Sequence, residues 1–455
     1  MESQDEASCS GEATNPFHKF RYPRIMPKQV AIASSTRYHT SLGLSRLQPN
    51  FSHRNKGRRV QEFAEYESLT KRDADAKNHD MHRNGRLKHL IFGSQLNTSL
   101  LDKLFRSADM IRRLSRDPEG NRRLRELLAH RRAMLYFTQP STRTFLSFMA
   151  ACQILGITCN EVRDPKTSSE VKRESKLDSI RMFSSYFDVI IMRSQINDYA
   201  ECCAYLMNDL ERHQQRSVPI INAGAGSDEH PTQALLDAYT ITRTFDFDEN
   251  SIQRDSRLAD LRAKYPNLTS GMDNKTYAFC GDIGRGRTVR SLASVLSQYK
   301  NVTMFFISPD QTALKLDDRL KQRLVRSGVN IVEFDSLDAL HNDQPMLSQI
   351  DCMYMTRIQR EHNSESTEAE LAAMDLSPFQ LTTERVAKMK DFAPILHPFP
   401  RDSVVNEIPT AVDSDPRVMY FRQARNGMWI RAALLVHLFD AADSLFMAYS
   451  DVITQ

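Results

Sequence analysis

A short apolar strand, a proline and a hydroxyl-rich turn stand directly before an apolar helix, and this stretch constrains the fold more than any other. Residues 133–137 (AMLYF) are apolar and partly aromatic, which predicts a buried strand. Pro140 ends the strand, and residues 141–144 (STRT) follow it. Apolar residues then recur at helical spacing over 145–155. The sequence therefore predicts a strand that leads through a tight turn into the N-terminus of a helix.

The STRT turn has the chemistry of an anion-binding site. The first backbone N–H groups of a helix have no partner inside the helix, and the helix dipole makes that end positive. Three hydroxyls and the two-pronged guanidinium of Arg143 add further donors. An ordinary Ser/Thr helix cap has the same local sequence and is the commoner of the two. The turn alone leaves both interpretations open, so other parts of the chain must decide between them.

Length and composition exclude several classes of protein. The 455 residues suffice for two or three domains, and no apolar run approaches the roughly 20 residues that span a bilayer. The net charge of +4 is too small to indicate nucleic acid as a partner of the whole chain. The seven cysteines are scattered and form no C-x-x-C pair or Cys/His cluster. They predict reduced thiols in a cytosol-like compartment, and no metal site.

Residues 1–85 differ in composition from the rest of the chain. Between residues 13 and 61 there is no Asp or Glu, whereas basic residues and serine are frequent and no periodicity persists. This predicts a disordered basic tail. It is interpreted first as dispensable, or as the product of a wrong start codon with Met81 as the true initiator. An organelle transit segment is the second interpretation, opposed by the acidic first dozen residues. A basic arm for an acidic partner is the third.

Two series of alternating strands and helices follow the tail. In the first, strands are predicted at 133–137, 157–162, 188–192 and 218–223. In the second, they are predicted at 276–280, 302–307, 330–334, 352–356 and 393–397. The fold class is therefore α/β, with two doubly wound α/β/α domains that have parallel sheets and are joined by interdomain helices. The expected domains are 86–238 and 239–428, and a C-terminal helix over 429–450 packs back on the first.

Cationic and amide side chains stand just past several predicted strand ends. They are Arg193, His230 with Gln233, Arg287, and Arg357 with Gln359. In a parallel sheet that edge is where ligands bind. Several cations with almost no carboxylates predict a polyanionic ligand and argue against acid/base catalysis by paired carboxylates. The glycines of residues 281–287 (GDIGRGR) do not match G-x-G-x-x-G, so no nicotinamide cofactor is expected.

From Leu87 to Leu445 the order of these motifs resembles that of the aspartate/ornithine carbamoyltransferase family. The series contains STRT, S-x-x-x-K at 168–172, MR at 192–193, HPTQ at 230–233, GRTVRSL at 286–292, TRIQ at 356–359, HPFPR at 397–401 and YFRQARNG at 420–427. The T-R-x-Q element and the proline after His397 resemble the aspartate branch. An ornithine carbamoyltransferase is expected to carry a cysteine after that histidine.

The resemblance implies transfer of the carbamoyl group from carbamoyl phosphate to the amine of L-aspartate. N-carbamoyl-L-aspartate and phosphate would be the products, in an early step of pyrimidine biosynthesis that needs no metal or cofactor. The implied carbamoyl-phosphate site comprises Ser141, Thr142, Arg143, Thr144, Arg193, His230, Gln233, Pro398 and Phe399. The implied aspartate site comprises Lys172, Arg287, Arg357 and Gln359. The implied catalytic residues are Arg143, Thr144, Arg193, His230 and Lys172.

The resemblance also implies how chains assemble and where they act. In the family, the loop that carries Ser168 and Lys172 enters the site of the neighbouring subunit, so a homotrimer with shared sites is expected. Higher assemblies stay open. No nucleic acid or membrane partner is expected. The expected location is the cytoplasm, with a plastid as the alternative if the tail is a transit segment.

Five positions depart from the family pattern without removing an implied ligand. They are Gln139 for Glu, Phe145 for Arg, Arg173 for Gly, Ala225 for Asp and His362 for Arg. These departures leave two alternatives to an active aspartate carbamoyltransferase. One is carbamoyl transfer to a different amine, which the TRIQ element opposes. The other is a catalytically weak pseudoenzyme subunit, which the complete set of implied ligands opposes.

Overall fold

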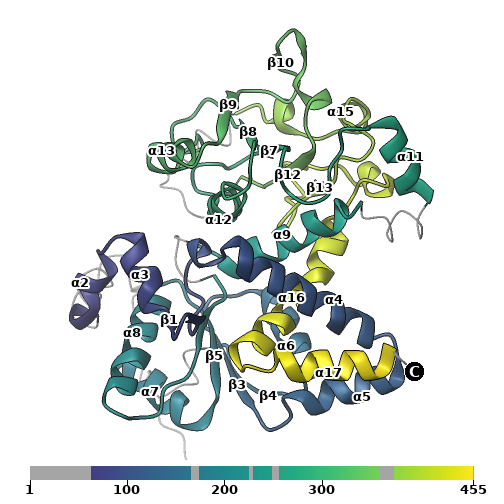
Figure 1. Ribbon diagram of the computed structural model, residues 1–455. Coiled ribbons are helices and arrows are strands. Elements are labelled where there is room, and N and C mark those ends of the chain that lie inside the picture. The colour runs from purple at the N-terminus through teal and green to yellow at the C-terminus, as the bar shows by residue number, and fades with distance from the viewer. Residues whose placement is uncertain (1–62, 165–173, 225–228, 248–255, 359–373, 454–455) are drawn as a thin grey trace, which may run out of the picture. The chain divides into compact units, whose positions relative to one another are not determined.

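The computed structural model describes residues 63–164, 174–224, 229–247, 256–358 and 374–453, and it contains two parallel sheets flanked by helices (Figure 1). The first sheet has the strand order β4-β3-β5-β6, and all of its neighbours are parallel. Its strands are β3 (Arg132–Phe137), β4 (Thr158–Val162), β5 (Val189–Arg193) and β6 (Ile220–Asn222).

Alternate side chains of β3 face two different layers of helices. Ala133, Leu135 and Phe137 belong to the hydrophobic cluster that includes the helices α4, α6, α9 and α16. Met134 and Tyr136 belong to a second cluster, which includes α8. Because side chains alternate along a strand, a sheet that is apolar on both faces needs cover on both. The helices are α4 (Thr98–Leu114), α5 (Pro118–Leu127), α6 (Thr142–Ile154), α7 (Lys176–Tyr186), α8 (Tyr199–Arg212) and α9 (Pro231–Thr244).

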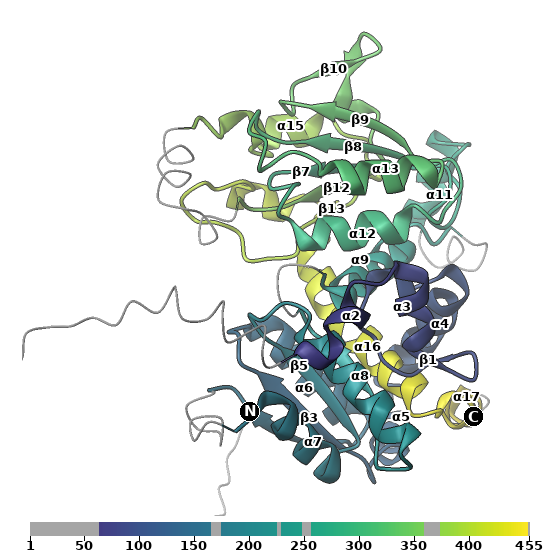
Figure 2. The same ribbon diagram turned by 90° about the vertical axis from the view of Figure 1, so that its left-hand side faces the viewer.

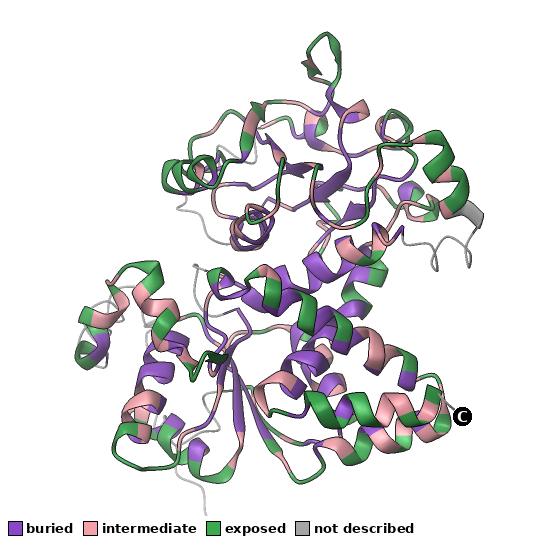
Figure 3. Ribbon diagram, in the orientation of Figure 1, coloured by how far each residue is buried: buried purple, intermediate pink, exposed green. Residues whose placement is uncertain are grey.

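The second sheet has the order β13-β12-β7-β8-β9 and is also parallel throughout. Figure 2 shows these strands one beside another in that order, and all of them except the edge strand β9 are largely buried (Figure 3). They are β7 (Thr276–Cys280), β8 (Thr303–Ile307), β9 (Asn330–Phe334), β12 (Cys352–Met355) and β13 (Ile395–Leu396). The helices that follow strands here are α12 (Arg287–Leu296), α13 (Asp318–Arg326) and α15 (Thr383–Ala387), and α11 (Ser256–Lys264) precedes β7.

The two parallel sheets confirm the predicted fold class, and their strands lie where the hydrophobic pattern predicts them. The shorter elements were not predicted, because two to five residues show no period. They are β10 (Leu340–His341), β11 (Gln344–Pro345), η2 (Gly93–Gln95), η5 (Met346–Ser348), η6 (Ser377–Phe379) and η7 (Thr410–Ser414). Among the described helices, none has both the length and the apolar character that a bilayer crossing requires.

The prediction that the tail is disordered as far as residue 85 is wrong from Phe63 onward. Residues 63–87 form η1 (Ala64–Tyr66), α2 (Glu67–Thr70), α3 (Ala74–Asp80), β1 (His82–Arg83) and β2 (Arg86–Leu87). α2 and α3 lie beside α8 (Figures 1 and 2), and Met81 is fully buried. The sequence did not reveal this segment because its elements are short and their apolar residues contact a distant helix. Residues 1–62 lie outside the described part of the chain.

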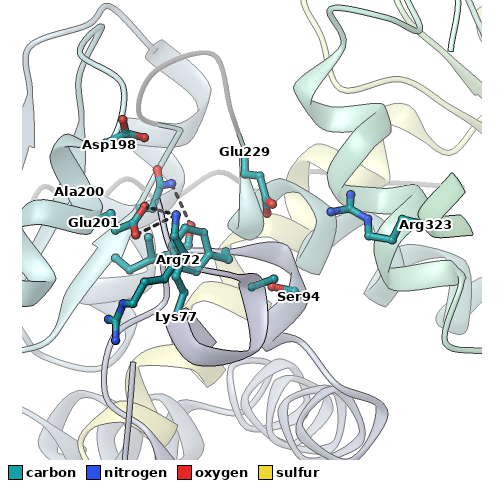
Figure 4. A pocket seen from close by; sticks show the side chains of 12 residues that line it. Arg72, Lys77, Ser94, Asp198, Ala200, Glu201, Glu229 and Arg323 are labelled. Carbon is teal, nitrogen blue, oxygen red and sulfur yellow. Dashed lines mark hydrogen bonds and ion pairs between the residues drawn. The ribbon is translucent and has the colours of Figure 1, made fainter. Parts of the chain in front are cut away.

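Ring and ion-pair contacts fix this segment to α8. The ring of Phe63 lies 5.3 Å from that of Tyr199, and the ring of Tyr66 lies 6.2 Å from that of Tyr205. Lys77 lies 3.0 Å from the carboxylate of the buried Glu201, in a cavity of about 250 Å³ (Figure 4). Burial raises the pKa of Glu201 to about 7 in spite of that charge. The segment therefore supplies both apolar contact area and the cation for a buried carboxylate.

The C-terminal helix was predicted as one element over 429–450, and this is also wrong. The chain forms α16 (Tyr420–Leu438) and α17 (Ala442–Ile453), and between them Asp440 adopts the left-handed φ of 58°. α16 packs against α4, α6 and α9, whereas α17 packs against α4 and α5. An apolar pattern that continues through the break conceals it in the sequence.

Removal of residues 1–80 should destabilise the protein much more than removal of residues 1–53. The longer truncation loses the buried rings of Phe63 and Tyr66, worth roughly 3–6 kcal/mol together, and leaves Glu201 without Lys77. Urea unfolding of chains 81–455 and 54–455 would measure the difference. Equal midpoints would contradict this role of the segment. Lys77→Met in the full chain tests the ion pair alone and should destabilise by less than the long truncation.

Candidate active site

One cavity of about 1540 Å³ collects side chains from both sheets. Eight arginines line it, and no Asp or Glu of the described residues does. Its walls contain every predicted site residue that the structure describes: Ser141, Thr142, Arg143, Thr144, Arg193, His230, Gln233, Arg287, Arg357, Pro398 and Phe399. The excess of cations in this cavity matches the polyanionic ligand that the sequence predicts.

The STRT turn occupies the N-terminus of α6 without a side-chain cap. Ser141 is the N-cap residue, yet its hydroxyl makes no capping hydrogen bond, and Thr142 begins the helix. Thr144 is buried, and the guanidinium of Arg143 lies 5.5 Å from the centre of the Phe399 ring. The pKa of Arg143 is lowered by burial and by the charge of Arg357. These donors face the cavity instead of closing the helix, which favours the anion-binding interpretation over the ordinary cap.

Arg193 ends β5 and stands among other cations. Its Nη1 donates to the carbonyl of Ala223 at 3.2 Å, and its buried Nε has no hydrogen-bond partner among the described residues. Burial, followed by the charges of Arg287, Arg431 and Arg143, lowers the pKa of Arg193 to about 9. An arginine in this state has donors available for an anion and gains from binding one.

His230 begins α9 and is held neutral. Its backbone N–H donates to Ser291 Oγ at 3.2 Å, and its Nδ1 lies 3.4 Å from Thr232 Oγ1. Burial, followed by the charges of Arg193, Arg287 and Arg431, lowers the pKa of His230 well below its ordinary value. If the Thr232 hydroxyl donates to Nδ1, then Nε2 carries the proton. The imidazole is then a neutral N–H donor.

Gly224 is a site residue that the sequence did not single out. Its φ is +103°, which favours glycine, and an added Cβ would lie 2.7 Å from Arg193 Nη1 and 3.1 Å from His230 Cδ2. Its carbonyl accepts from Arg287 Nη1 at 3.3 Å. Because this position has no side chain, the side chains of Arg193, His230 and Arg287 can approach one another.

His397 has a structural role in the loop that follows β13. Its Nδ1 accepts from the backbone N–H of Phe399 at 2.8 Å, and its Nε2 lies 2.9 Å from Glu407 Oε1. Both oxygens of Glu407 also lie 3.1 Å from the backbone N–H of Asp402. This network fixes the turn in which Pro398 and Phe399 line the cavity.

The remaining predicted site residues and the five departures from the family pattern lie partly outside the described residues. Ser168, Lys172 and Gln359 lie outside, as do Arg173, Ala225 and His362. Gln139 lines the cavity, and its buried Oε1 has no partner among the described residues. The ring of Phe145 lies 5.4 Å from that of Phe137, in the core. Within the ranges described, no three His, Cys, Asp or Glu side chains are grouped as they would be to hold a metal.

Arg431 and Asp237 were missed by sequence reasoning. Arg431 is almost fully buried on α16 and lies 4.8 Å from the centre of the Phe148 ring. Burial lowers its pKa to about 9, and the nearby Asp237 opposes this effect. Each residue is a lone charge inside an apolar helical run, WIRAALL and ALLDAYT. That was the available signal, because a charge on a buried face requires a partner or a function.

A cavity at the ligand-binding edge of two parallel sheets, rich in guanidinium, hydroxyl and amide donors, defines an α/β enzyme that acts on anionic substrates. Comparison with known proteins gives the family. Residues 88–243 match the family model of the aspartate/ornithine carbamoyltransferase carbamoyl-P binding domain, and residues 273–438 match that of the Asp/Orn binding domain. The chain belongs to the aspartate/ornithine carbamoyltransferase family.

Individual relatives agree with this assignment. The chain is 35% identical over 352 residues to the chloroplastic aspartate carbamoyltransferase of Arabidopsis thaliana, covering 77% of each. Its fold is similar to the catalytic subunit of M. jannaschii aspartate transcarbamoylase, with a TM-score of 0.62, 32% identity and coverage of 78% and 98%. A Trypanosoma cruzi aspartate transcarbamoylase in complex with carbamoyl phosphate and aspartate gives a TM-score of 0.62, 29% identity and coverage of 76% and 95%. The family resemblance is thereby confirmed.

The neutral state of His230 predicts a stability difference at acid pH. In the unfolded chain this histidine gains a proton below about pH 6.5, whereas the native imidazole resists protonation. The unfolded state therefore binds more protons as the pH falls, and this destabilises the native protein. His230→Gln should escape that loss, which amounts to about 2 kcal/mol at pH 5 relative to pH 7.

Urea unfolding of both proteins at pH 7 and pH 5, at one protein concentration, measures this difference. His89 and His397 are also buried, but both are present in each protein, so the comparison isolates His230. His213→Gln, at an exposed histidine, is the matched control. Parallel losses in wild type and His230→Gln would contradict a neutral native imidazole.

Proposed function

We propose that this protein is a catalytically active aspartate carbamoyltransferase. It transfers the carbamoyl group of carbamoyl phosphate to the amine of L-aspartate and releases N-carbamoyl-L-aspartate and phosphate. The observation that supports this best is the cavity, in which an uncapped helix N-terminus, eight arginines and a neutral histidine face one space. Such a space fits two anionic substrates held side by side.

Carbamoyl phosphate binds at the first sheet. The phosphate accepts hydrogen bonds from the turn Ser141–Thr144 and from the guanidinium of Arg193. Gln233 and the backbone carbonyls of Pro398 and Phe399 accept from the carbamoyl NH₂. The domain 86–238 is the carbamoyl-phosphate domain in this proposal, and 239–428 is the aspartate domain.

Thr144, Arg193 and His230 polarise the carbamoyl carbonyl and stabilise the tetrahedral intermediate. The deprotonated amine of aspartate attacks the carbonyl carbon, so that a C–N bond forms and the carbonyl oxygen gains negative charge. Fixed donors aimed at that oxygen act as an oxyanion hole. The intermediate then breaks its C–O bond to phosphate, and the departing phosphate accepts the amine proton. No covalent bond to the enzyme forms.

Aspartate binds through its carboxylates to Arg287 and Arg357. Gln359 and the Lys172 of a neighbouring subunit complete the site in this proposal, and Ser168 of the same loop contacts the phosphate. The assembly is a homotrimer with shared sites. The reaction belongs to pyrimidine biosynthesis and is assigned to the cytoplasm. The Arabidopsis relative is named chloroplastic, so a plastid is the alternative, and a fluorescent fusion of the full chain distinguishes the two.

Purified full-length protein should form product from carbamoyl phosphate and L-aspartate, and none from L-ornithine. Ureido product and phosphate, followed together, measure this. His230→Ala should lower kcat by about 10²–10³-fold, because it removes a donor from the oxyanion hole. His213→Ala, at an exposed histidine, is the control. Product with ornithine only would mean that the aspartate ligands are misassigned. Absence of any product and of binding by a bisubstrate analogue would favour a pseudoenzyme.

Shared sites predict that two inactive variants complement each other. Arg143→Ala damages the helix N-terminus of its own chain, and Lys172→Ala damages the loop that enters the neighbour. Dissociation and random mixing of equal amounts should restore about a quarter of the sites. A site is intact when its own chain keeps Arg143 and the neighbouring chain keeps Lys172, and each condition is met in about half of the cases. Activity that stays at the level of the separate variants would contradict a site shared between subunits.

A further inference from the structure

Asp237 is a buried carboxylate that joins three separate segments of the active site. It lies on α9, one helical turn after Gln233, and is completely buried. Three side chains donate to it: Gln233 Nε2 at 2.9 Å, Gln423 Nε2 at 2.6 Å and the hydroxyl of Tyr354 at 2.7 Å. Both glutamine amides donate to Oδ1 and the tyrosine hydroxyl to Oδ2, so the two oxygens have room for all three bonds.

The bond to Asp237 fixes which way the amide of Gln233 faces. A carboxylate accepts and does not donate, so the NH₂ of Gln233 must face Asp237. The carbonyl oxygen of the same amide is then the atom available to the cavity that Gln233 lines. That oxygen is an acceptor, which suits the NH₂ of a carbamoyl group and does not suit a phosphate oxygen.

Gln423 extends the same constraint to the loop after β13. Its NH₂ donates to Asp237, and its carbonyl oxygen accepts from the backbone N–H of His397 at 2.9 Å. Pro398 and Phe399, which follow that N–H, line the cavity. The positions of the oxygen and the NH₂ of the Gln423 amide are therefore both determined. Through this amide, the position of the loop at 397–399 depends on Asp237.

Tyr354 carries the constraint to the second sheet. It is buried on β12, three residues before Arg357, and its hydroxyl donates to the second oxygen of Asp237. Arg431 is the neighbouring cation: its charge opposes the rise in pKa that burial produces at Asp237. One carboxylate thus connects α9, the loop after β13 and the strand that leads to Arg357.

We propose that Asp237 is a positioning residue for carbamoyl transfer, one that orients Gln233 and the loop at 397–399 toward the carbamoyl NH₂ and holds both against the strand of Arg357. This inference rests on the proposed function. Asp237 does not touch a substrate itself, since two glutamine amides stand between it and the groups they position. Its effect should therefore be selective for the carbamoyl group.

Asp237→Leu tests the inference, because it keeps about the size of the side chain and removes the oxygen that accepts from both glutamine amides. Neither amide is then held with its carbonyl oxygen toward the group that it positions. Carbamoyl phosphate should bind about tenfold more weakly, and kcat should fall about 10²-fold through misplacement of the reacting groups. Binding of inorganic phosphate, which has no NH₂, should stay within about twofold of wild type.

Acetyl phosphate sharpens the test, since it has a methyl group in place of the NH₂. Wild type should bind carbamoyl phosphate more tightly than acetyl phosphate, and Asp237→Leu should lose that preference. Tyr354→Phe removes the hydroxyl that links Asp237 to β12 and should raise the KM for aspartate by about tenfold without changing carbamoyl-phosphate binding. Tyr239→Phe is the matched control, since its hydroxyl donates to Asp109 at 2.7 Å from the same helix.

The outcomes separate this inference from the proposed function. If wild type forms no carbamoyl aspartate, the proposed function fails. If wild type is active and Asp237→Leu keeps its preference for carbamoyl phosphate, the positioning role is overturned. Parallel loss of phosphate and carbamoyl-phosphate binding would also overturn it, because that result describes a merely structural residue. Should Asp237→Leu fail to fold, Tyr354→Phe against Tyr239→Phe decides, and equal effects would overturn the inference.

Discussion

The accumulation of positive charge in one cavity is the constraint on which the rest of the structure depends. Eight arginines line the space, and burial together with their mutual repulsion lowers the pKa of Arg193 to about 9. Charges in a low-dielectric site are unfavourable unless they are paired. No carboxylate of the described residues lines the cavity, and the buried Nε of Arg193 has no hydrogen-bond partner among them, so an anionic ligand would stabilise this charge. The fold therefore has to hold these cations in place before a ligand arrives.

Parallel sheets hold the cations because they fix the direction in which each chain segment leaves the core. Arg193 ends β5, and Arg357 follows β12 by two residues, so both positions are set by buried strands. Close approach is possible because Gly224 leaves no side chain between Arg193 and His230. The helix α16 then packs along α4, α6 and α9 and brings Arg431 beneath the cavity. Rigid hydrophobic packing offsets the electrostatic cost of the site.

The sequence predicted the strands and the fold class, because a buried strand of a parallel sheet is a short continuous apolar run. It predicted donors at strand ends, because the residue after such a strand lies at the ligand-binding edge. It did not reveal the segment from Phe63 to Met81, whose elements are short and whose buried rings contact the distant helix α8. It also missed Arg431 and Asp237, because each is a single charge in an apolar helix, and its partners come from other elements. Spacing along the chain identifies ligand groups, but not the groups that orient them.

Asp237 shows how a carboxylate can serve a site that must bind a phosphate. A negative charge that faced the cavity would weaken the binding of the phosphate dianion and would also destabilise the developing oxyanion. Gln233 and Gln423 stand between the carboxylate and the groups that it orients, and both turn their NH₂ toward it. Each amide is held in one orientation by Asp237, and the amide separates the carboxylate charge from the cavity. In the proposed binding mode, a carbonyl oxygen faces the carbamoyl NH₂ on one side of the reacting carbon, while N–H donors face the oxygen on the other. Selectivity for a carbamoyl group over a phosphate alone would follow from this arrangement of neutral dipoles around one buried charge.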